Sequence, residues 1–386
     1  MNLKKLISII LCFALCATVF TACGSSNADA PKNGGNSSGE GINGGSSSVV
    51  DTKAPNSQTD PTEPVFVLPK NYLNRKYQDI LFKNNDIRST DILKISVIDT
   101  VKDAPADAYD VSDGENKSVL AWITDDMELI IAGEGGVVAG SCKNTFMGYR
   151  KAETIDLSGF YTNYSESFEA MFSGCQSVKK LDLSHFVTKN VETMEYMFND
   201  CNSLEELDIS SFNTAKVENM RGMFNYCNSM KHLDLTHFDT SKVKDMAYMF
   251  AFCWKLESVN VSSFNTGKVK DMTYLFADCE TMTSVDLSSF TNENVTCMTG
   301  MFASCDEITS IDVSNFNTSK VTDYSRMFEN CAKLTDLNLS SFDLVTSGTN
   351  FDKMFYGCKA LTSVGCELTL PRWCTREDMY TKSGLK

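Results

Sequence analysis

The most regular set of potentially reactive side chains in this sequence is a column of eight cysteines. They recur every 26 residues, with one interval of 27, at Cys175, Cys201, Cys227, Cys253, Cys279, Cys305, Cys331 and Cys358. A metal site needs two to four thiolates that converge on one point, usually from closely spaced pairs. Single cysteines at this spacing instead predict one inward-facing side chain in each turn of a repeat. We therefore expect a structural core ladder of buried free thiols that binds no metal.

After Cys23, four further cysteines lie outside this column. Cys366 and Cys374 stand near the C-terminal end, where a disulfide between them would staple the terminal segment, as an exported protein permits. Cys142 and Cys297 have no partner that the sequence identifies.

A column of acidic side chains has the same period. Its members are Asp156, Asp182, Asp208, Asp234, Asn260, Asp286, Asp312 and Asn338, and a Ser or Thr follows each of them two residues later. Carboxylates side by side on neighbouring strands repel each other. Hydrogen bonds from hydroxyl or turn N–H groups would offset the repulsion, and a cation held between carboxylates is the alternative. Glycoside hydrolysis needs one carboxyl group in a distinct, apolar setting, which a uniform column does not offer.

Other catalytic patterns are weak. The sequence has only three histidines, at His185, His232 and His237, and none is in a metalloprotease spacing. The glycine-rich stretch 133–140 lacks the Lys and Ser/Thr that a phosphate-binding loop requires. We therefore predict no catalytic residues, no cofactor and no enzymatic activity.

The elements that position these columns belong to a 26-residue repeat. In one unit, Leu207 and Ile209 alternate with polar residues, which predicts a short half-buried strand. Val217, Met220 and Met223 follow at helical spacing and predict one or two turns of helix. One such unit cannot bury its own apolar face, but stacked units can. The sequence therefore predicts an α/β solenoid of about nine 26-residue turns with a parallel sheet on one side.

The repeat resembles that of a known family. The unit from Cys227 to Phe250 is similar to the 26-residue repeat of BspA-like leucine-rich-repeat bacterial surface proteins, and the resemblance covers about residues 143–364. It implies a right-handed leucine-rich-repeat superhelix in an exported surface protein, and some members of the family are associated with adhesion. The resemblance carries over no ligand-binding residue.

The segment before the repeats indicates export. Lys4 and Lys5, an apolar stretch and small residues before Cys23 resemble a bacterial lipoprotein signal peptide, which assigns residues 1–22 to the signal and makes Cys23 the lipidated residue. Residues 23–64 are rich in Gly, Ser, Asn and Pro and predict a disordered, lipid-anchored linker. We expect an extracytoplasmic protein, anchored to the bacterial cell membrane through Cys23 and exposed at the cell surface.

The remaining segments are expected to cover the ends of the stack, since a solenoid exposes apolar surface at each end. Residues 65–142 predict a small α+β N-terminal cap, 143–365 the solenoid, and 366–386 a C-terminal cap. Residues 375–378 form a capping box, which predicts a short closing helix anchored by Trp373.

The candidate binding residues are aromatic side chains at positions that the core does not require. They cluster on the third to sixth turns as Tyr196, Tyr226, Tyr248, Phe252, Trp254 and Tyr274. Exposed Tyr and Trp often anchor protein or glycan contacts; the alternative is a stack of aromatic rings that only shields the outer face.

The net charge of −15 argues against a nucleic-acid partner, which would need a basic footprint. We predict a monomeric, non-catalytic binding module for adhesion to an unidentified host or microbial surface protein or glycan. A structural envelope protein without a specific ligand is the first alternative, and an envelope- or glycan-degrading enzyme is a distant one.

Overall fold

The computed structural model describes residues 71–83, 86–344, 348–368, 370 and 374–385. The expected signal peptide, Cys23, the linker and Trp373 lie outside the described residues. No helix within the described part of the chain is long and apolar enough to span a bilayer.

The N-terminal segment forms a sheet that continues into the repeats. It contains α2 (Tyr77–Phe82), the 3-10 helix η1 (Ser89–Asp91), β1 (Lys94–Ile98), β2 (Tyr109–Asp110), β3 (Val119–Ile123), β4 (Glu128–Gly133) and β5 (Val137–Val138). The first sheet has the order β2-β3-β4-β1-β6, in which β6 (Thr154–Asp156) is the first strand of the repeat region. Strand β3 is antiparallel to β2 and β4, whereas β1 is parallel to β4 and β6. A second parallel pair joins β5 to β7 (Phe160–Tyr161).

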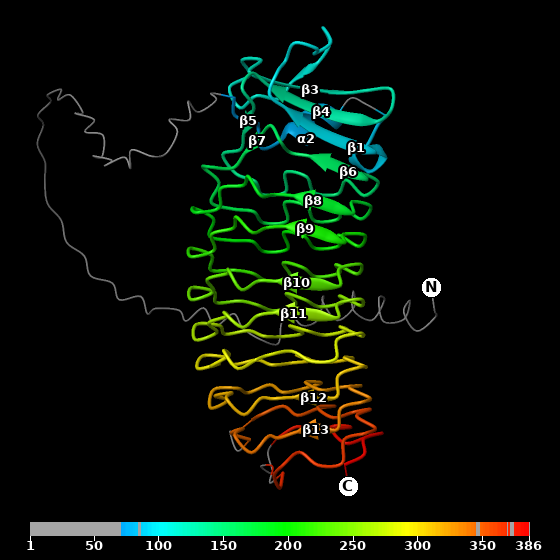
Figure 1. The fold of residues 1–386 in the computed structure, drawn as a ribbon, viewed down its shortest axis with the longest axis vertical. Coiled ribbons are helices and arrows are strands. Elements are labelled where there is room, and N and C mark those ends of the chain that lie inside the picture. Colours follow the sequence, from blue (N-terminus) through cyan, green and yellow to red (C-terminus); the bar gives the residue numbers. More distant parts are fainter. Residues whose placement is uncertain (1–70, 84–85, 345–347, 369, 371–373, 386) are drawn as a thin grey trace, which may run out of the picture. The chain divides into compact units, whose positions relative to one another are not determined.

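The repeat units, which we call coils, stack through short parallel strands, drawn from green to red in Figure 1. These strands are β8 (Lys180–Asp182), β9 (Glu206–Asp208), β10 (His232–Asp234), β11 (Ser258–Asn260), β12 (Ser310–Ile311) and β13 (Asp336–Leu337). They pair as β8–β9, β10–β11 and β12–β13, with each residue opposite its equivalent one repeat later. In β8, Leu181 is buried between exposed Lys180 and Asp182. The predicted solenoid with a parallel sheet is therefore confirmed.

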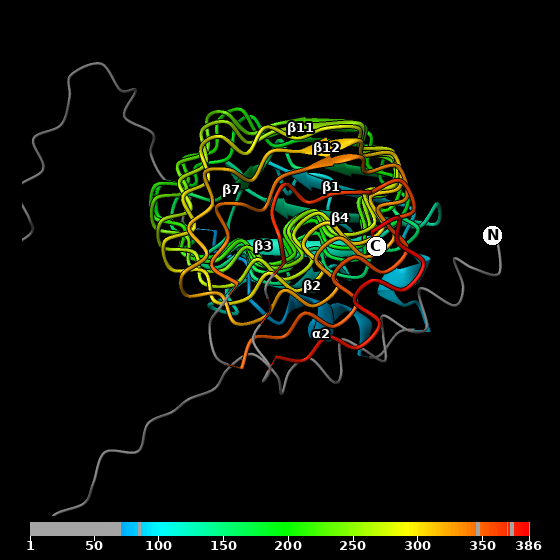
Figure 2. The same cartoon turned by 90° about the horizontal axis from the view of Figure 1, so that it is seen from below.

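A second ladder of parallel bridges runs along the same coils. It joins Ser167, Thr193, Asn219, Asp245, Asp271, Cys297, Asp323, Asn350 and Thr375 in succession. Viewed from below, the successive coils lie over one another (Figure 2). This ladder joins every successive pair of coils from Ser167 to Thr375, and the strand pairs add a second set of bonds between some of these coils, so equivalent residues stay in register.

The helix predicted after each strand is absent: the residues around Val217–Phe224 form consecutive turns. In each coil, backbone N–H groups at alternate positions bond to the next coil. Met194, Tyr196 and Phe198 donate to the carbonyls of the residues 25 positions later, at 2.8–2.9 Å. Between them, the Met197 N–H closes a turn on the Met194 carbonyl at 3.2 Å, and the Glu195 N–H donates to Thr193 Oγ1 at 3.3 Å. An α-helix would direct these donors to i−4 within the same segment, so the helical part of the α/β prediction is wrong.

The predicted helix does not form because a residue in the left-handed conformation lies two positions before and two positions after each inward-facing Phe. The positions before are Ala170, Tyr196, Gly222, Tyr248, Tyr274, Gly300, Arg326 and Lys353, with φ from 51° to 60°. The positions after are Gly174, Asp200, Tyr226, Phe252, Asp278, Ser304, Asn330 and Gly357, with φ from 56° to 79°. A right-handed helix cannot continue through residues with positive φ, so the chain folds into turns.

The aromatic rings that these turns point inward form one continuous stack. It consists of Phe146, Phe172, Phe198, Phe224, Phe250, Phe276, Phe302, Phe328, Phe355 and Tyr380, with centroids 5.3–6.2 Å apart and planes within 12° of each other. All nine Phe side chains are fully buried. Offset stacking at this distance is favourable beyond the burial of apolar area.

The predicted closing helix at the C-terminal end, where Tyr380 is the last member of the stack, is not found. The expected closing helix is replaced by a further coil-like segment in which Thr375 pairs with Asn350. The N–H of Phe355 donates to the Met379 carbonyl at 3.0 Å, and Asp378 takes the left-handed position with φ 52°. The edge of the preceding coil offers unpaired backbone groups, and this pairing satisfies them, which a separate helix would not.

The end at which the stack begins packs against α2. The phenol of Tyr77, a buried residue of α2, donates to the Thr145 carbonyl and lies 3.2 Å from the hydroxyl of Tyr149. Tyr149 occupies the column position that cysteine holds in later coils.

Glycines in the left-handed columns make room for a neighbouring ring, which gives a testable prediction. Gly222 has φ +58°, and an added Cβ would lie 2.3 Å from atoms of the Tyr196 ring. Gly148, two positions after Phe146 in the other left-handed column, has φ +83° but nothing within 4 Å of an added Cβ. We expect G148A to lower the free energy of unfolding by about 1 kcal/mol through backbone strain alone, and G222A by roughly 2–4 kcal/mol because a clash is added. Urea unfolding measures both, and equal losses would contradict the packing described.

Candidate functional site

The eight cysteines of the repeat column are buried and hydrogen-bonded between coils. Each thiol donates to the carbonyl of a stacked Phe in the preceding coil: Cys227 Sγ lies 3.3 Å from the Phe198 oxygen and Cys253 Sγ 3.1 Å from that of Phe224. Burial raises the pKa of Cys175 and Cys253 to about 12 and that of Cys227 well above its usual range. The thiols therefore stay protonated and act as hydrogen-bond donors in the core, a setting that disfavours both metal binding and nucleophilic attack.

The other four cysteines differ in their surroundings. Cys297 occupies the bridge column, where its Sγ lies 3.1 Å from Thr273 Oγ1 and 3.3 Å from Thr299 Oγ1. Cys142 is buried. Cys366 and Cys374 are partly exposed free thiols in the structure, and the disulfide between them stays a prediction.

The carboxylates of the acidic column are stabilised by hydrogen bonds within each coil. Asp208 Oδ1 accepts the Ser210 N–H at 3.0 Å and its hydroxyl at 2.7 Å, and the same turn recurs from Asp156 to Asn338. These bonds hold the pKa of Asp182 and Asp208 below its usual range. No group of three or more His, Cys, Asp or Glu side chains in the described residues converges as metal ligands do. The hydrogen-bonded alternative is therefore the one that the geometry favours.

The aromatic candidates pack against one another. The Tyr226 and Phe252 rings stack at 4.5 Å, and those of Tyr248 and Tyr274 at 5.4 Å. Tyr248 is 7% exposed and Phe252 5%, while Tyr196, Tyr226, Trp254 and Tyr274 are partly buried. This packing matches a shielding stack and not a set of exposed anchors.

The same residues, apart from Trp254, occupy the left-handed columns, which sequence reasoning missed. A signal was present, because Gly222, Gly300, Gly174 and Gly357 share those columns, and glycine recurring at one repeat position indicates positive φ. The tyrosines and glycines also complement each other: the Tyr196 ring covers Gly222, and the Tyr274 ring covers Gly300.

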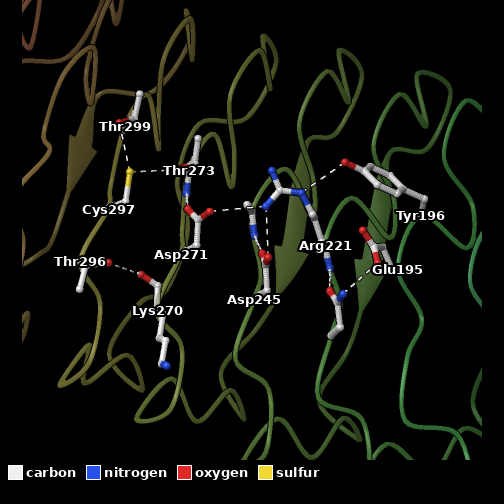
Figure 3. A network of polar contacts seen from close by, with 12 residues as sticks. Glu195, Tyr196, Arg221, Asp245, Lys270, Asp271, Thr273, Thr296, Cys297 and Thr299 are labelled. Carbon is white, nitrogen blue, oxygen red and sulfur yellow. Dashed lines mark hydrogen bonds and ion pairs between the residues drawn. The ribbon is translucent and has the colours of Figure 1, made fainter. Parts of the chain in front are cut away.

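A polar network centred on Arg221 crosses several coils beside this stack (Figure 3). Its Nη1 lies 3.1 Å from Asp245 Oδ2 and 3.4 Å from Asp271 Oδ2, and its Nε donates to the Tyr196 hydroxyl at 3.3 Å. The guanidinium also lies 5.2 Å from the centroid of the Tyr248 ring. Burial raises the pKa of Asp245 although Arg221 opposes that shift. The arrangement ties four coils together, and no local sequence pattern indicates it because the partners are about 25 and 50 residues apart.

The exposed positions beside the buried valines carry positive charge. Lys216, Lys242, Lys244, Lys268 and Lys270 are exposed on three consecutive coils; we call these five residues the lysine strip. They flank Val217, Val243 and Val269, which are fully buried. The strip gives a locally basic surface to a chain of net charge −15.

The buried thiols predict selective chemical labelling. Iodoacetamide at pH 8 should modify Cys366 and Cys374 in the folded protein, once mild reduction has opened the disulfide predicted between them. It should leave the eight ladder cysteines unmodified, because thiolate is the reactive form and burial suppresses it. Peptide mass spectrometry measures the modification, and labelling in guanidinium provides the fully reactive control. Modification of any ladder cysteine under native conditions would contradict the core position.

The Arg221 network predicts pH-dependent stability. R221M leaves Asp245 and Asp271 near each other without their cation, so we expect a loss of roughly 1–3 kcal/mol in the free energy of unfolding at pH 7. The pKa of Asp245 should then rise further. A carboxyl with a raised folded-state pKa destabilises when ionised and is relieved as pH falls through that pKa, so the loss should shrink towards pH 4. R221K, which keeps the charge, is the control in urea unfolding, and a loss independent of pH would refute the account.

Comparison with known proteins identifies the family of the repeats. No curated protein matches the chain significantly. Among solved structures, a leucine-rich cell surface protein from Faecalibacterium prausnitzii A2-165 is 14% identical over 68% of this chain and 83% of that chain, with a TM-score of 0.30. A TLR13–ssRNA13 complex is 12% identical over 59% of this chain and 39% of that chain, with a TM-score of 0.20. A leucine-rich-repeat protein of Leptospira interrogans is 10% identical over 68% and 80%, with a TM-score of 0.18.

Similarities this remote carry no argument about function. The model of the family described as "Mycoplasma protein of unknown function, DUF285" matches residues 140–256 and 249–367, which together span more than half of the 386 residues and coincide with the stacked coils. The chain belongs to the DUF285 family.

Proposed function

We propose that this protein is a non-catalytic module that binds a macromolecule at the bacterial cell surface, with adhesion as its role. The observation that carries the proposal is the contrast between its interior and its exterior. Inward columns such as the Phe stack and the thiol ladder repeat in coil after coil. The exposed columns on the same backbone vary, and the lysine strip is their most concentrated feature.

A stack of this kind suits binding better than chemistry. Its continuous ladder of bridges, supplemented by the strand pairs, holds successive coils in register, so exposed side chains are displayed in rows on a scaffold that loses little entropy when a partner binds. A row of side chains along the stack can contact an extended partner over its whole length, and repeat proteins commonly use such extended binding surfaces.

The proposed location follows from the sequence before the repeats. Cys23 would carry the lipid, and residues 23–64 would form a linker that lifts the coils away from the membrane. A flexible linker of about 40 residues has a root-mean-square reach of roughly 35 Å. Adhesion requires such a display, since the binding surface must be accessible from outside the envelope.

The proposal is tested with the full chain, purified in mild detergent and applied to an array of matrix proteins and of neutral and acidic glycans. We expect saturable binding to at least one class, with a dissociation constant of about micromolar or tighter. Antibody labelling of intact cells, with the C23A variant as control for anchoring, locates the protein. Absence of binding by a folded, surface-exposed chain across the array would overturn adhesion and favour a structural role in the envelope.

A further inference from the structure

The charge on the lysine strip is poorly compensated. Among the described residues, the ammonium groups of Lys242, Lys268 and Lys270 have no ion-pair partner. Lys244 pairs with Glu218 at 2.6 Å, and Lys216 donates to the Asn190 amide oxygen at 3.0 Å. Of the five cations of the strip, only Lys244 is therefore in an ion pair.

Electrostatic effects on nearby acids show that these lysines act on a common surface. The pKa of Glu218 is lowered first by its hydrogen bond to Lys244, and Lys242 and Lys268 lower it further. Asp239, beside the strip, also has a lowered pKa, caused mainly by Ser241 and in part by Lys242. Lys242 and Lys244 of one coil and Lys268 of the next thus contribute to one positive region.

The strip is separate from the other charged features. Asp245 and Asp271 directly follow Lys244 and Lys270 in the sequence, and both carboxylates bond to Arg221. Further along the stack, Lys320 continues the column and donates to the Asn294 amide oxygen at 2.6 Å. The positive character is therefore strongest over the three coils of the strip and does not depend on the Arg221 network.

The spacing of the strip favours one class of partner. Strand-paired coils repeat at ~4.8 Å, and the Phe rings, which recur once per coil, are 5.6–5.8 Å apart across coils 198–250. Lysines in one column therefore recur at about the length of a single sugar unit. A linear acidic glycan, with one anionic group on each or every second sugar, can lie along the columns and meet a lysine at each step.

We propose that the lysine strip binds a linear anionic glycan, one that carries sulfate, phosphate or carboxylate groups along its length. This inference rests on the proposed binding function and names the class of its partner. The flexible lysine stems adapt to any of these anions, because an ammonium group is a point charge without the fixed fork of arginine. Binding would be largely electrostatic and would weaken steeply with salt.

The test uses the full chain and three probes: a heparin-type sulfated polysaccharide, a polyglycerol phosphate and a polyuronate. Affinity is measured from 50 to 300 mM NaCl. The variant K242Q/K268Q/K270Q should bind at least tenfold more weakly than the unaltered chain at the lowest salt, and its salt dependence should be shallower. K242R/K268R/K270R should bind within about threefold of the unaltered chain.

A charge-matched control removes three exposed lysines elsewhere, as K102Q/K255Q/K359Q. It makes the same change in net charge and should alter affinity less than twofold. Because all six side chains are exposed, thermal unfolding should be unchanged in both variants. Equal weakening by both glutamine variants would overturn the strip as the site.

Two further arms separate this inference from the proposed function. Preferential binding to vesicles of phosphatidylglycerol, or to single-stranded DNA, at matched charge would overturn the assignment to a glycan. Binding to a neutral glycan or a matrix protein, without binding to any of the three polyanions, would refute the inference and leave the adhesive role intact. Absence of binding to every probe and array component would refute both.

Discussion

The structure depends on where its backbone N–H groups are directed. In each coil, alternate donors reach the carbonyls of the next coil, while the donors between them close tight turns. Left-handed residues two positions before and after each stacked Phe make this alternation possible. A buried backbone donor without a partner is costly, so the N–H groups of each coil need the carbonyl groups of its neighbour. An isolated coil would have neither these hydrogen bonds nor a buried face.

Identical interior columns follow from this sideways bonding. Since each residue lies opposite its equivalent in the next coil, a residue type that recurs at one position of the repeat meets copies of itself. Phenylalanine suits such a column because its rings stack in offset parallel pairs. Cysteine suits the next one because its thiol is small and reaches the Phe carbonyl of the preceding coil. Buried threonines form a third column, in which Thr188 Oγ1 donates to the Asn213 carbonyl at 3.0 Å and accepts its N–H at 2.7 Å.

The same rule makes charge difficult to place, because like charges in one column repel. The structure meets this in two ways. In the Asp column, hydrogen bonds from Ser and Thr residues of the same coil stabilise each charged carboxylate, and the carboxylates of Asp245 and Asp271 share Arg221. The lysine strip departs from this pattern, since its cations are stacked with little compensation. The ammonium groups of the strip repel one another, and an anionic ligand would supply the negative charge that offsets this repulsion.

The sequence by itself determined the repeat length, the stacking of coils, the parallel strands and the inward position of the Phe and Cys columns. These follow from period and alternation, because a side chain that recurs once per coil must occupy the same place in each. Only the tertiary structure decided the local conformation between strands. Val217, Met220 and Met223 have the spacing of a helix, yet the N–H groups of that segment are satisfied by the next coil, and a pattern within one unit cannot show a partner in another. For the same reason the aromatic residues proved to cover the coils, and Arg221 and the lysine strip emerged only when residues about 25 positions apart were placed side by side.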